Sequence, residues 1–290
     1  MCDEHFEEDA KEYQRSLLSR RKFGAMTVGA GLFALLPRVE GAVAVTESEV
    51  NIKTPDGTAD CYFVHPATGT GAGVLVWPDI LGLRPAFRQM GKRLAESGYS
   101  VLVVNPFYRQ KKAPVVAPGA SFSDPAVSGA VMPLAQALNA TTHVTDAKAF
   151  IAWMDTQAAV AKNRKIGTTG YCMGGPMVMR TAGAVPGRVG AAGTFHGGGL
   201  ATAAADSPHL LIPQMKAQFL IAIADGDDKR DPVAKTTLKD SFAKAGLAAE
   251  IEVYTGAQHG WCPPDSAVYS KEAAEKAWSR MMVLFGKALA

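Results

Sequence analysis

A cysteine stands where a sharp strand-to-helix turn is expected, in the stretch GYCMGG over Gly170–Gly175. The form Gly-x-Cys-x-Gly between an apolar run and a helical segment is typical of a nucleophile elbow. Gly170 and Gly174 lack a Cβ, so strand and helix can approach closely and lift Cys172 above a sheet. The positive end of the following helix would favour a thiolate. Taken alone, the pentapeptide equally fits a small buried residue in a glycine-rich turn.

A base and an acid follow later in the chain, in the order nucleophile, acid, histidine that this kind of triad uses. The run IAIADGDDKRDP offers four carboxylates, Asp225, Asp227, Asp228 and Asp231, and VYTGAQHGW presents His259 in a glycine-flanked loop. Asp231 precedes Pro232 and is better explained as a helix N-cap. The spacing from the preceding strand favours Asp227 as the acid, whereas counting back from Pro232 favours Asp228, so both stay open.

Three further residues end predicted strands at the same edge. In WPDILGLRP, the N–H of Ile80 is a candidate oxyanion donor beside the N–H of Met173. Asp79 is either a residue of the substrate site or a cap for the helix that follows. His196, in TFHGGGL, either lines the pocket or is a buried core histidine.

The elements that must position these residues alternate between strand and helix, which predicts a doubly wound, mostly parallel α/β sheet. Seven apolar runs are predicted strands: 61–66, 73–78, 100–106, 165–171, 190–197, 218–224 and 249–254. Helices are expected over 84–97, after a Thr145 or Asp146 cap, between Asp231 and Gly246, and over about 271–288. No linker after residue 45 divides the chain, so residues 45–290 are expected to form one domain.

One stretch departs from this alternation. Residues 110–140 contain several prolines and little periodicity, which predicts an irregular insertion. Long irregular segments of compact domains are often lids or binding loops. The insertion is therefore either lid-like or a surface excursion.

The N-terminal 44 residues resemble an export signal. Arg20 and Arg21 precede an apolar run of about thirteen residues, which is too short for a bilayer span, and AVA at 42–44 fits a cleavage site. The SRRKF stretch indicates the twin-arginine type. We therefore expect a periplasmic or secreted protein with no stable membrane anchor after processing.

Composition excludes several partners. The 290 residues carry a formal net charge of only +3, so nucleic acid is not expected. The cysteines and histidines lack metal-ligand spacing, so neither a metal nor another cofactor is expected. Residues 45–290 contain three cysteines, Cys61, Cys172 and Cys262, so at least one has no intrachain partner, and pairing of Cys61 with Cys262 stays open. We expect a monomer.

From about Glu49 to Leu289 the chain resembles the dienelactone hydrolase family of α/β-hydrolases. The resemblance lies in GVLVWPDILGLRPAFRQMGKRLAESGYSVLVVNPFYR, in GYCMGG, and in GAQHGW with its trailing helix. It implies an eight-stranded sheet and a Cys-His-Asp triad. The family often has Glu at the position of Asp79, and it uses an Arg after the FY stretch to meet a substrate carboxylate. Arg109 is a candidate for that role, with a register that differs by one residue.

A cysteine nucleophile restricts the substrate. A thiolate leaves a tetrahedral intermediate more readily than an alkoxide, so ordinary alkyl esters revert while enol esters and strained lactones go forward. We therefore expect a carboxylic ester hydrolase that cleaves an activated ester or lactone through an acyl-enzyme, similar to a carboxymethylenebutenolidase. The alternatives are a non-catalytic binding protein on a hydrolase scaffold and a thiol redox protein.

Overall fold

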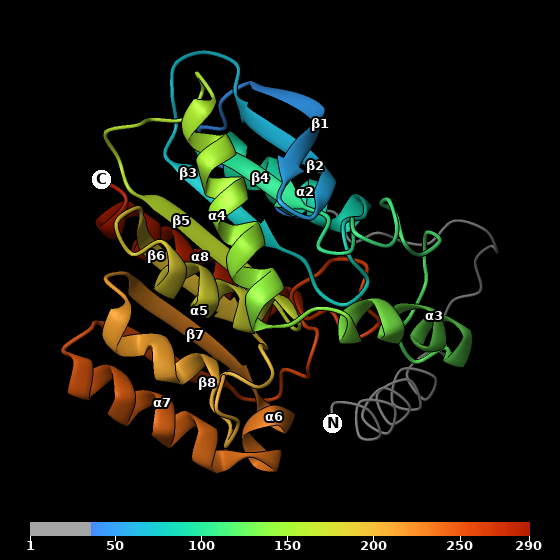
Figure 1. Ribbon diagram of the computed structural model, residues 1–290, viewed down its shortest axis with the longest axis vertical. Coiled ribbons are helices and arrows are strands. Elements are labelled where there is room, and N and C mark those ends of the chain that lie inside the picture. The colour runs from blue at the N-terminus through green and yellow to red at the C-terminus, as the bar shows by residue number, and fades with distance from the viewer. Residues whose placement is uncertain (1–35) are drawn as a thin grey trace.

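One eight-stranded sheet organises the chain (Figure 1). The computed structural model describes residues 36–290, so most of the predicted export signal lies outside the described residues. The strands are β1 (Val45–Thr54), β2 (Gly57–Pro66), β3 (Gly73–Trp77), β4 (Ser100–Val104), β5 (Ile166–Tyr171), β6 (Val189–Phe195), β7 (Gln218–Ala224) and β8 (Ala249–Tyr254). Their order is β1-β2-β4-β3-β5-β6-β7-β8. Strands β1, β2 and β4 pair antiparallel and all other neighbours pair parallel, which confirms the predicted mostly parallel sheet.

Helices cover both faces of this sheet (Figure 1). They are α2 (Pro85–Glu96), α3 (Pro125–Gln136), α4 (Ala140–Thr156), α5 (Gly174–Ala184), α6 (Asp225–Arg230), α7 (Pro232–Ala245) and α8 (Lys271–Ala288), with a 3₁₀ helix η1 (Pro208–Gln214). One core packs α2 and α8 against the sheet through Phe87, Met281 and Phe285. The other packs α4, α5 and α7 through Phe150, Met177 and Phe242. Each such buried side chain contributes about 1.5–3 kcal/mol.

The seven predicted strands are all present, and β1 is the one that sequence reasoning missed. Only Ile52 of β1 is buried, because the strand lies at the edge of the sheet and carries polar residues on its open side. It pairs with β2 across a tight turn at Pro55–Asp56. A Pro-Asp-Gly turn signal between the two strands was therefore available in the sequence.

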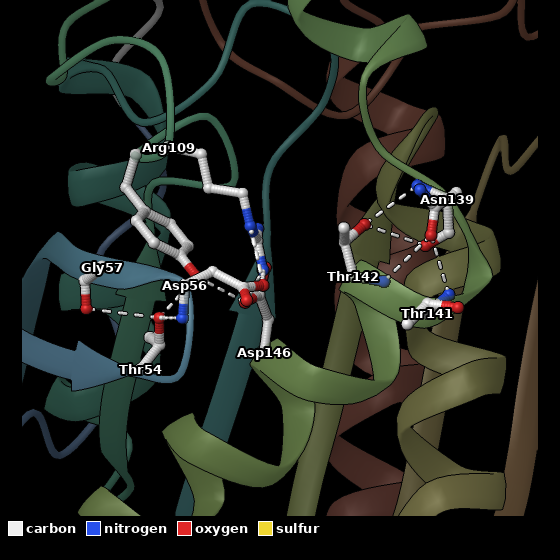
Figure 2. A network of polar contacts seen from close by, with 9 residues as sticks. Thr54, Asp56, Gly57, Arg109, Asn139, Thr141, Thr142 and Asp146 are labelled. Atoms are coloured by element: carbon white, nitrogen blue, oxygen red, sulfur yellow. Dashed lines mark hydrogen bonds and ion pairs between the residues drawn. The ribbon is translucent and has the colours of Figure 1, made fainter.

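Two helix predictions need correction. Helix α4 begins six or seven residues earlier than a cap at Thr145 or Asp146 predicts, because Asn139 and Thr142 form a capping box that satisfies its first N–H groups (Figure 2). Asp146 is therefore not a cap but a buried residue in the middle of the helix. The predicted irregular insertion over 110–140 contains helix α3, which starts with an Asp124–Pro125 pair. That pair is the same start signal that was recognised correctly at Asp231 and Pro232.

None of the helices in residues 36–290 is long and apolar enough to cross a bilayer. Within the same range the thiols of Cys61, Cys172 and Cys262 are free, so Cys61 does not pair with Cys262.

Candidate active site

Cys172 occupies a strained turn between β5 and α5. Its φ is +52°, in the left-handed region that side chains with a Cβ rarely adopt. A Cβ on Gly170 would lie 2.4 Å from the carbonyl oxygen of Gly174, and a Cβ on Gly174 would lie 2.4 Å from that of Trp77. Both glycines are therefore required by the turn. The cysteine side chain is left partly exposed at the carboxyl edge of the sheet.

The predicted acid and base lie together beyond β7 and β8. The Nδ1 atom of His259 hydrogen-bonds with Oδ2 of Asp227 at 2.7 Å. The neighbouring Asp228 instead accepts a bond from Nζ of Lys235 at 2.9 Å. Asp227 is thus the carboxylate that orients the His259 ring. It lies in the short helix α6, which was not among the predicted helices.

The thiol of Cys172 meets the same imidazole. Burial of His259 lowers its pKa, but the negative charge on Cys172, the hydrogen bonds of the ring with Asp227 and Cys172, and the charge on Asp227 together outweigh burial. The pKa of His259 is therefore raised well above its usual value of 6.5. Since Nδ1 is taken by Asp227, Nε2 is the nitrogen available to the thiol. The chain of contacts runs from carboxylate to imidazole to sulfur, which is the arrangement that moves a proton off a nucleophile.

His196 is packed behind this ring and is not open to solvent. It is 1% exposed, and its ring lies edge-on to His259 at 5.1 Å between centroids and to Trp261 at 5.0 Å. Neither ring nitrogen has a hydrogen-bond partner among the described residues. Burial, together with the neighbouring His259, holds the pKa of His196 well below its usual value of 6.5, so the ring stays neutral. The structure therefore places His196 in the core behind the site rather than on its surface.

Asp79 lies at the expected edge, but its carboxylate is bound by an arginine. Arg84 donates to both oxygens of Asp79 at 2.6 and 3.0 Å, and the N–H of Leu81 donates to the same group at 2.9 Å. Arg84 also binds Asp265, at 2.7 and 2.9 Å. The alternative role of Asp79 as a helix cap is wrong, because no side chain caps the first turn of α2.

The two candidate oxyanion donors belong to loops in contact. The close approach of Gly174 to Trp77 and Pro78 brings the β3 loop against the elbow. Ile80 and Met173 therefore follow two touching backbone segments, and their side chains pack on one apolar cluster. This position suits two N–H groups that converge on a negative oxygen.

Arg109 is held away from any ligand role by two carboxylates (Figure 2). Its guanidinium donates to Asp56 through Nε at 3.0 Å and to Asp146 at 2.7 and 2.8 Å. It also lies over the ring of Tyr108 at 4.6 Å. Burial of the guanidinium opposes its charge, but these carboxylates raise the pKa of Arg109 above its already high value. We therefore do not carry Arg109 into the proposed function.

Comparison with known proteins identifies the family of the chain. The profile of the dienelactone hydrolase family matches residues 59–289. The chain belongs to the dienelactone hydrolase family. It is 27% identical over 251 residues to the carboxymethylenebutenolidase of Rhodococcus opacus, covering 82% of this chain and 90% of the relative.

Solved structures agree with the α/β-hydrolase fold of the family. The dienelactone hydrolase of Anabaena variabilis has a TM-score of 0.60 at 15% identity, covering 85% of this chain and 99% of that one. A dienelactone hydrolase-like promiscuous phosphotriesterase, P91, from metagenomic libraries has a TM-score of 0.70 at 20% identity, covering 85% and 100%. The chain is thus a hydrolase of the dienelactone hydrolase family.

Two features of this dienelactone hydrolase family member were missed from sequence. The first is the pair of ion pairs that joins Asp79 through Arg84 to Asp265; Arg84 and Asp265 are 181 positions apart in the sequence. The second is the aromatic packing of His196 on Trp261. The only available sign of either was that Asp265 and Trp261 follow His259 within the same loop.

Proposed function

We propose that Cys172 is the nucleophile of a Cys-His-Asp triad that hydrolyses an activated ester or lactone. The observation that carries the proposal is the hydrogen bond of 2.7 Å between Asp227 and Nδ1 of His259, with Cys172 bonded to the same ring. Three segments remote in sequence supply these groups at one edge of the sheet. Open α/β sheets hold their sites at that edge.

The first half-reaction forms an acyl-enzyme. The Cys172 thiolate attacks the carbonyl carbon, and the N–H groups of Ile80 and Met173 hold the negative oxygen. The intermediate collapses, the C–O bond breaks, and the imidazolium of His259 gives its proton to the leaving oxygen. A thioester on Cys172 and the free alcohol or enol result.

The second half-reaction regenerates the thiolate. His259 takes a proton from water as the hydroxide attacks the thioester, and the C–S bond breaks. Asp227 holds the imidazole in the required tautomer throughout. Because sulfur leaves more readily than an alkoxide in the first step, substrates with a stabilised leaving oxygen are favoured. The relative named carboxymethylenebutenolidase supports a lactone of this kind.

The decisive experiment compares wild type with Cys172→Ala on aryl esters and enol lactones. We expect the variant to lose hydrolysis to background while its circular dichroism and Tm stay close to wild type. Iodoacetamide should inactivate the wild type in step with alkylation of Cys172. Unchanged turnover in the variant would refute the triad, and a wild type that neither reacts nor turns over would favour a binding protein. Consumption of peroxide with a thiol reductant, without ester turnover, would favour the redox alternative.

Export and oligomeric state belong to the same proposal. We propose that the chain leaves the cytoplasm by the twin-arginine route and acts as a monomer in the periplasm or outside the cell. Strand β1 begins at Val45, directly after the expected cleavage site, which supports a domain that starts there. Sequencing the N-terminus of the exported protein should give Val45, and light scattering should give the monomer mass. Loss of export in an Arg20→Lys, Arg21→Lys variant tests the route.

A further inference from the structure

The insertion between β4 and α4 packs an apolar cluster against Met173, which follows Cys172, and against Ile80 of the β3 loop. Phe107, Val115 and Val131 are buried at its centre, and Phe122 and Leu134 pack against them. Ile80 and Met173, from the two loops that flank Cys172, pack on the same cluster. We call Phe122 and Leu134, with Ile80 and Met173, the acyl wall. All four members are partly exposed, so part of each side chain is open to solvent.

The nearest arginine on the β3 loop is saturated. Nε of Arg84 donates to Asp265, one terminal nitrogen donates to Asp79 and to the carbonyl of Gly82, and the other donates to Asp79 and Asp265. These five bonds match the five N–H donors that a guanidinium possesses. Arg84 thus has no donor left for a substrate carboxylate.

The arginine on the β4 loop is engaged in the same way. Arg109 lies between Asp56 and Asp146, as Arg84 lies between Asp79 and Asp265. Each trio contains one positive and two negative groups, so each has a formal charge of −1. A negatively charged acyl group would find no free guanidinium donor in the Arg84 trio and would lose hydration against the apolar wall.

We propose that the acyl wall selects an uncharged, apolar acyl group, so that the substrate is a neutral lactone or activated ester rather than a carboxylate-bearing one. This inference rests on the proposed function, because it concerns the group transferred to Cys172. Phe122 and Leu134 are specificity-determining residues in it, since they contact the acyl chain and not the reacting atoms.

A matched pair of esters tests the inference. The p-nitrophenyl monoester of adipic acid is compared with its neutral isostere, in which an isopropyl group replaces the terminal carboxylate. Both release the same p-nitrophenol, so intrinsic reactivity and detection are equal. We expect kcat/KM to be higher for the neutral ester by about tenfold or more, because an ionised carboxylate gains nothing from an apolar surface. Equal or faster turnover of the charged ester overturns the proposal.

Variants of the acyl wall test whether its side chains cause the preference for the neutral ester. Phe122→Ala should lower kcat/KM for the neutral ester by about fivefold and change the charged ester by less than about twofold, since only the former loses apolar contact. Leu134→Ala, whose side chain comes from helix α3, should act in the same direction and serves if the first variant folds poorly. Val283→Ala is the control, because Val283 is 40% exposed on α8 and lies outside the wall. An unchanged ester ratio in both wall variants contradicts the assignment.

The proposed function and the acyl-wall proposal would be contradicted by different results. If the wild type hydrolyses neither ester, or Cys172→Ala hydrolyses both as well as wild type does, the proposed function fails and takes the specificity with it. If turnover depends on Cys172 but the charged ester is preferred, only the acyl-wall proposal fails.

Discussion

Two units that pair carboxylates with a basic side chain lie in the loops after the strands, and they differ in the basic group. In the first, Asp227 holds His259. In the second, Asp79 and Asp265 hold Arg84, whose side chain is only 6% exposed. An imidazole can release and regain a proton near neutral pH, whereas a guanidinium keeps its charge under all conditions that leave a protein folded.

The two units differ in what they can do: one can transfer a proton and the other can only support the structure. The carboxylates are similar, so the difference comes from the basic side chain that each unit holds. The His259 unit is suited to chemistry, since its partner can titrate. The Arg84 unit is suited to holding two loops in place, since removal of the arginine would leave two buried carboxylates without a partner.

The largest effect is expected from a substitution that breaks the His259 unit. Asp227→Asn should lower kcat on an aryl ester by about 10³–10⁴-fold, because the amide no longer holds the imidazole in the productive tautomer. Its Tm should stay close to that of wild type. Asp228→Asn is the matched control and should retain activity within about threefold, because Asp228 binds Lys235 and not His259. Equal losses in the two variants would contradict the assignment of the acid.

Breaking the Arg84 unit should change stability more than chemistry. Arg84→Met is expected to lower the free energy of unfolding by about 3–5 kcal/mol, because the largely buried carboxylates of Asp79 and Asp265 lose their positive partner. Urea titration measures this loss. Arg88→Met, in the first turn of the helix that follows Arg84, removes an arginine paired with the exposed Glu49 and should cost at most about 1 kcal/mol. A smaller loss for Arg84→Met than for Arg88→Met would show that the unit is not structural.

The adjacent histidines His259 and His196 should affect the pH dependence of stability in opposite directions. The pKa of His259 is raised, so its contribution to stability is complete below about pH 6.5 and is lost as pH rises through the raised value. The pKa of His196 is lowered, so its contribution is present above about pH 6.5 and is lost as pH falls. The folded state thus favours the proton on one ring and opposes it on the other.

A substitution of the buried His196 ring isolates its contribution to the pH dependence of stability. This is the smallest of the expected effects. His196→Phe keeps an aromatic ring and removes the site that the unfolded chain protonates in acid. Relative to wild type, the variant should gain up to about 1.4 kcal/mol of stability per pH unit between pH 6.5 and 5. Ester turnover at pH 7.5 should stay within about threefold. A difference in urea midpoint that does not vary with pH would contradict the neutral state of His196.

The fold was largely predictable because its central strands are continuous apolar runs. β3, β4, β5 and β7 are buried on both faces, and burial of that kind produces an unmistakable pattern. The edge strand β1 was missed because only one of its side chains is buried. The start of α4 was misplaced because Asn139 and Asp146 are both good caps in isolation, and only the packing of α4 decides between them.

The site was predictable where its residues end strands. Cys172, Asp227 and His259 each follow a strand, so topology alone brings them together. The roles of Asp79 and Arg109 were not predictable, because they depend on partners from remote segments. Asp265 lies in the loop beyond His259, and Asp146 lies inside α4, positions that no local spacing connects to either residue.

The guanidinium of Arg84 has one more consequence, for the way in which the loops around the site can separate. Asp79 belongs to the loop with Ile80, and Asp265 to the loop with His259, so a single side chain ties these two walls of the site into one rigid frame. Opening between them would require both ion pairs to separate at once. Separation of α3 from these loops would instead break apolar contacts, those of Val131 and Leu134 with the cluster on which Ile80 and Met173 pack, rather than an ion pair.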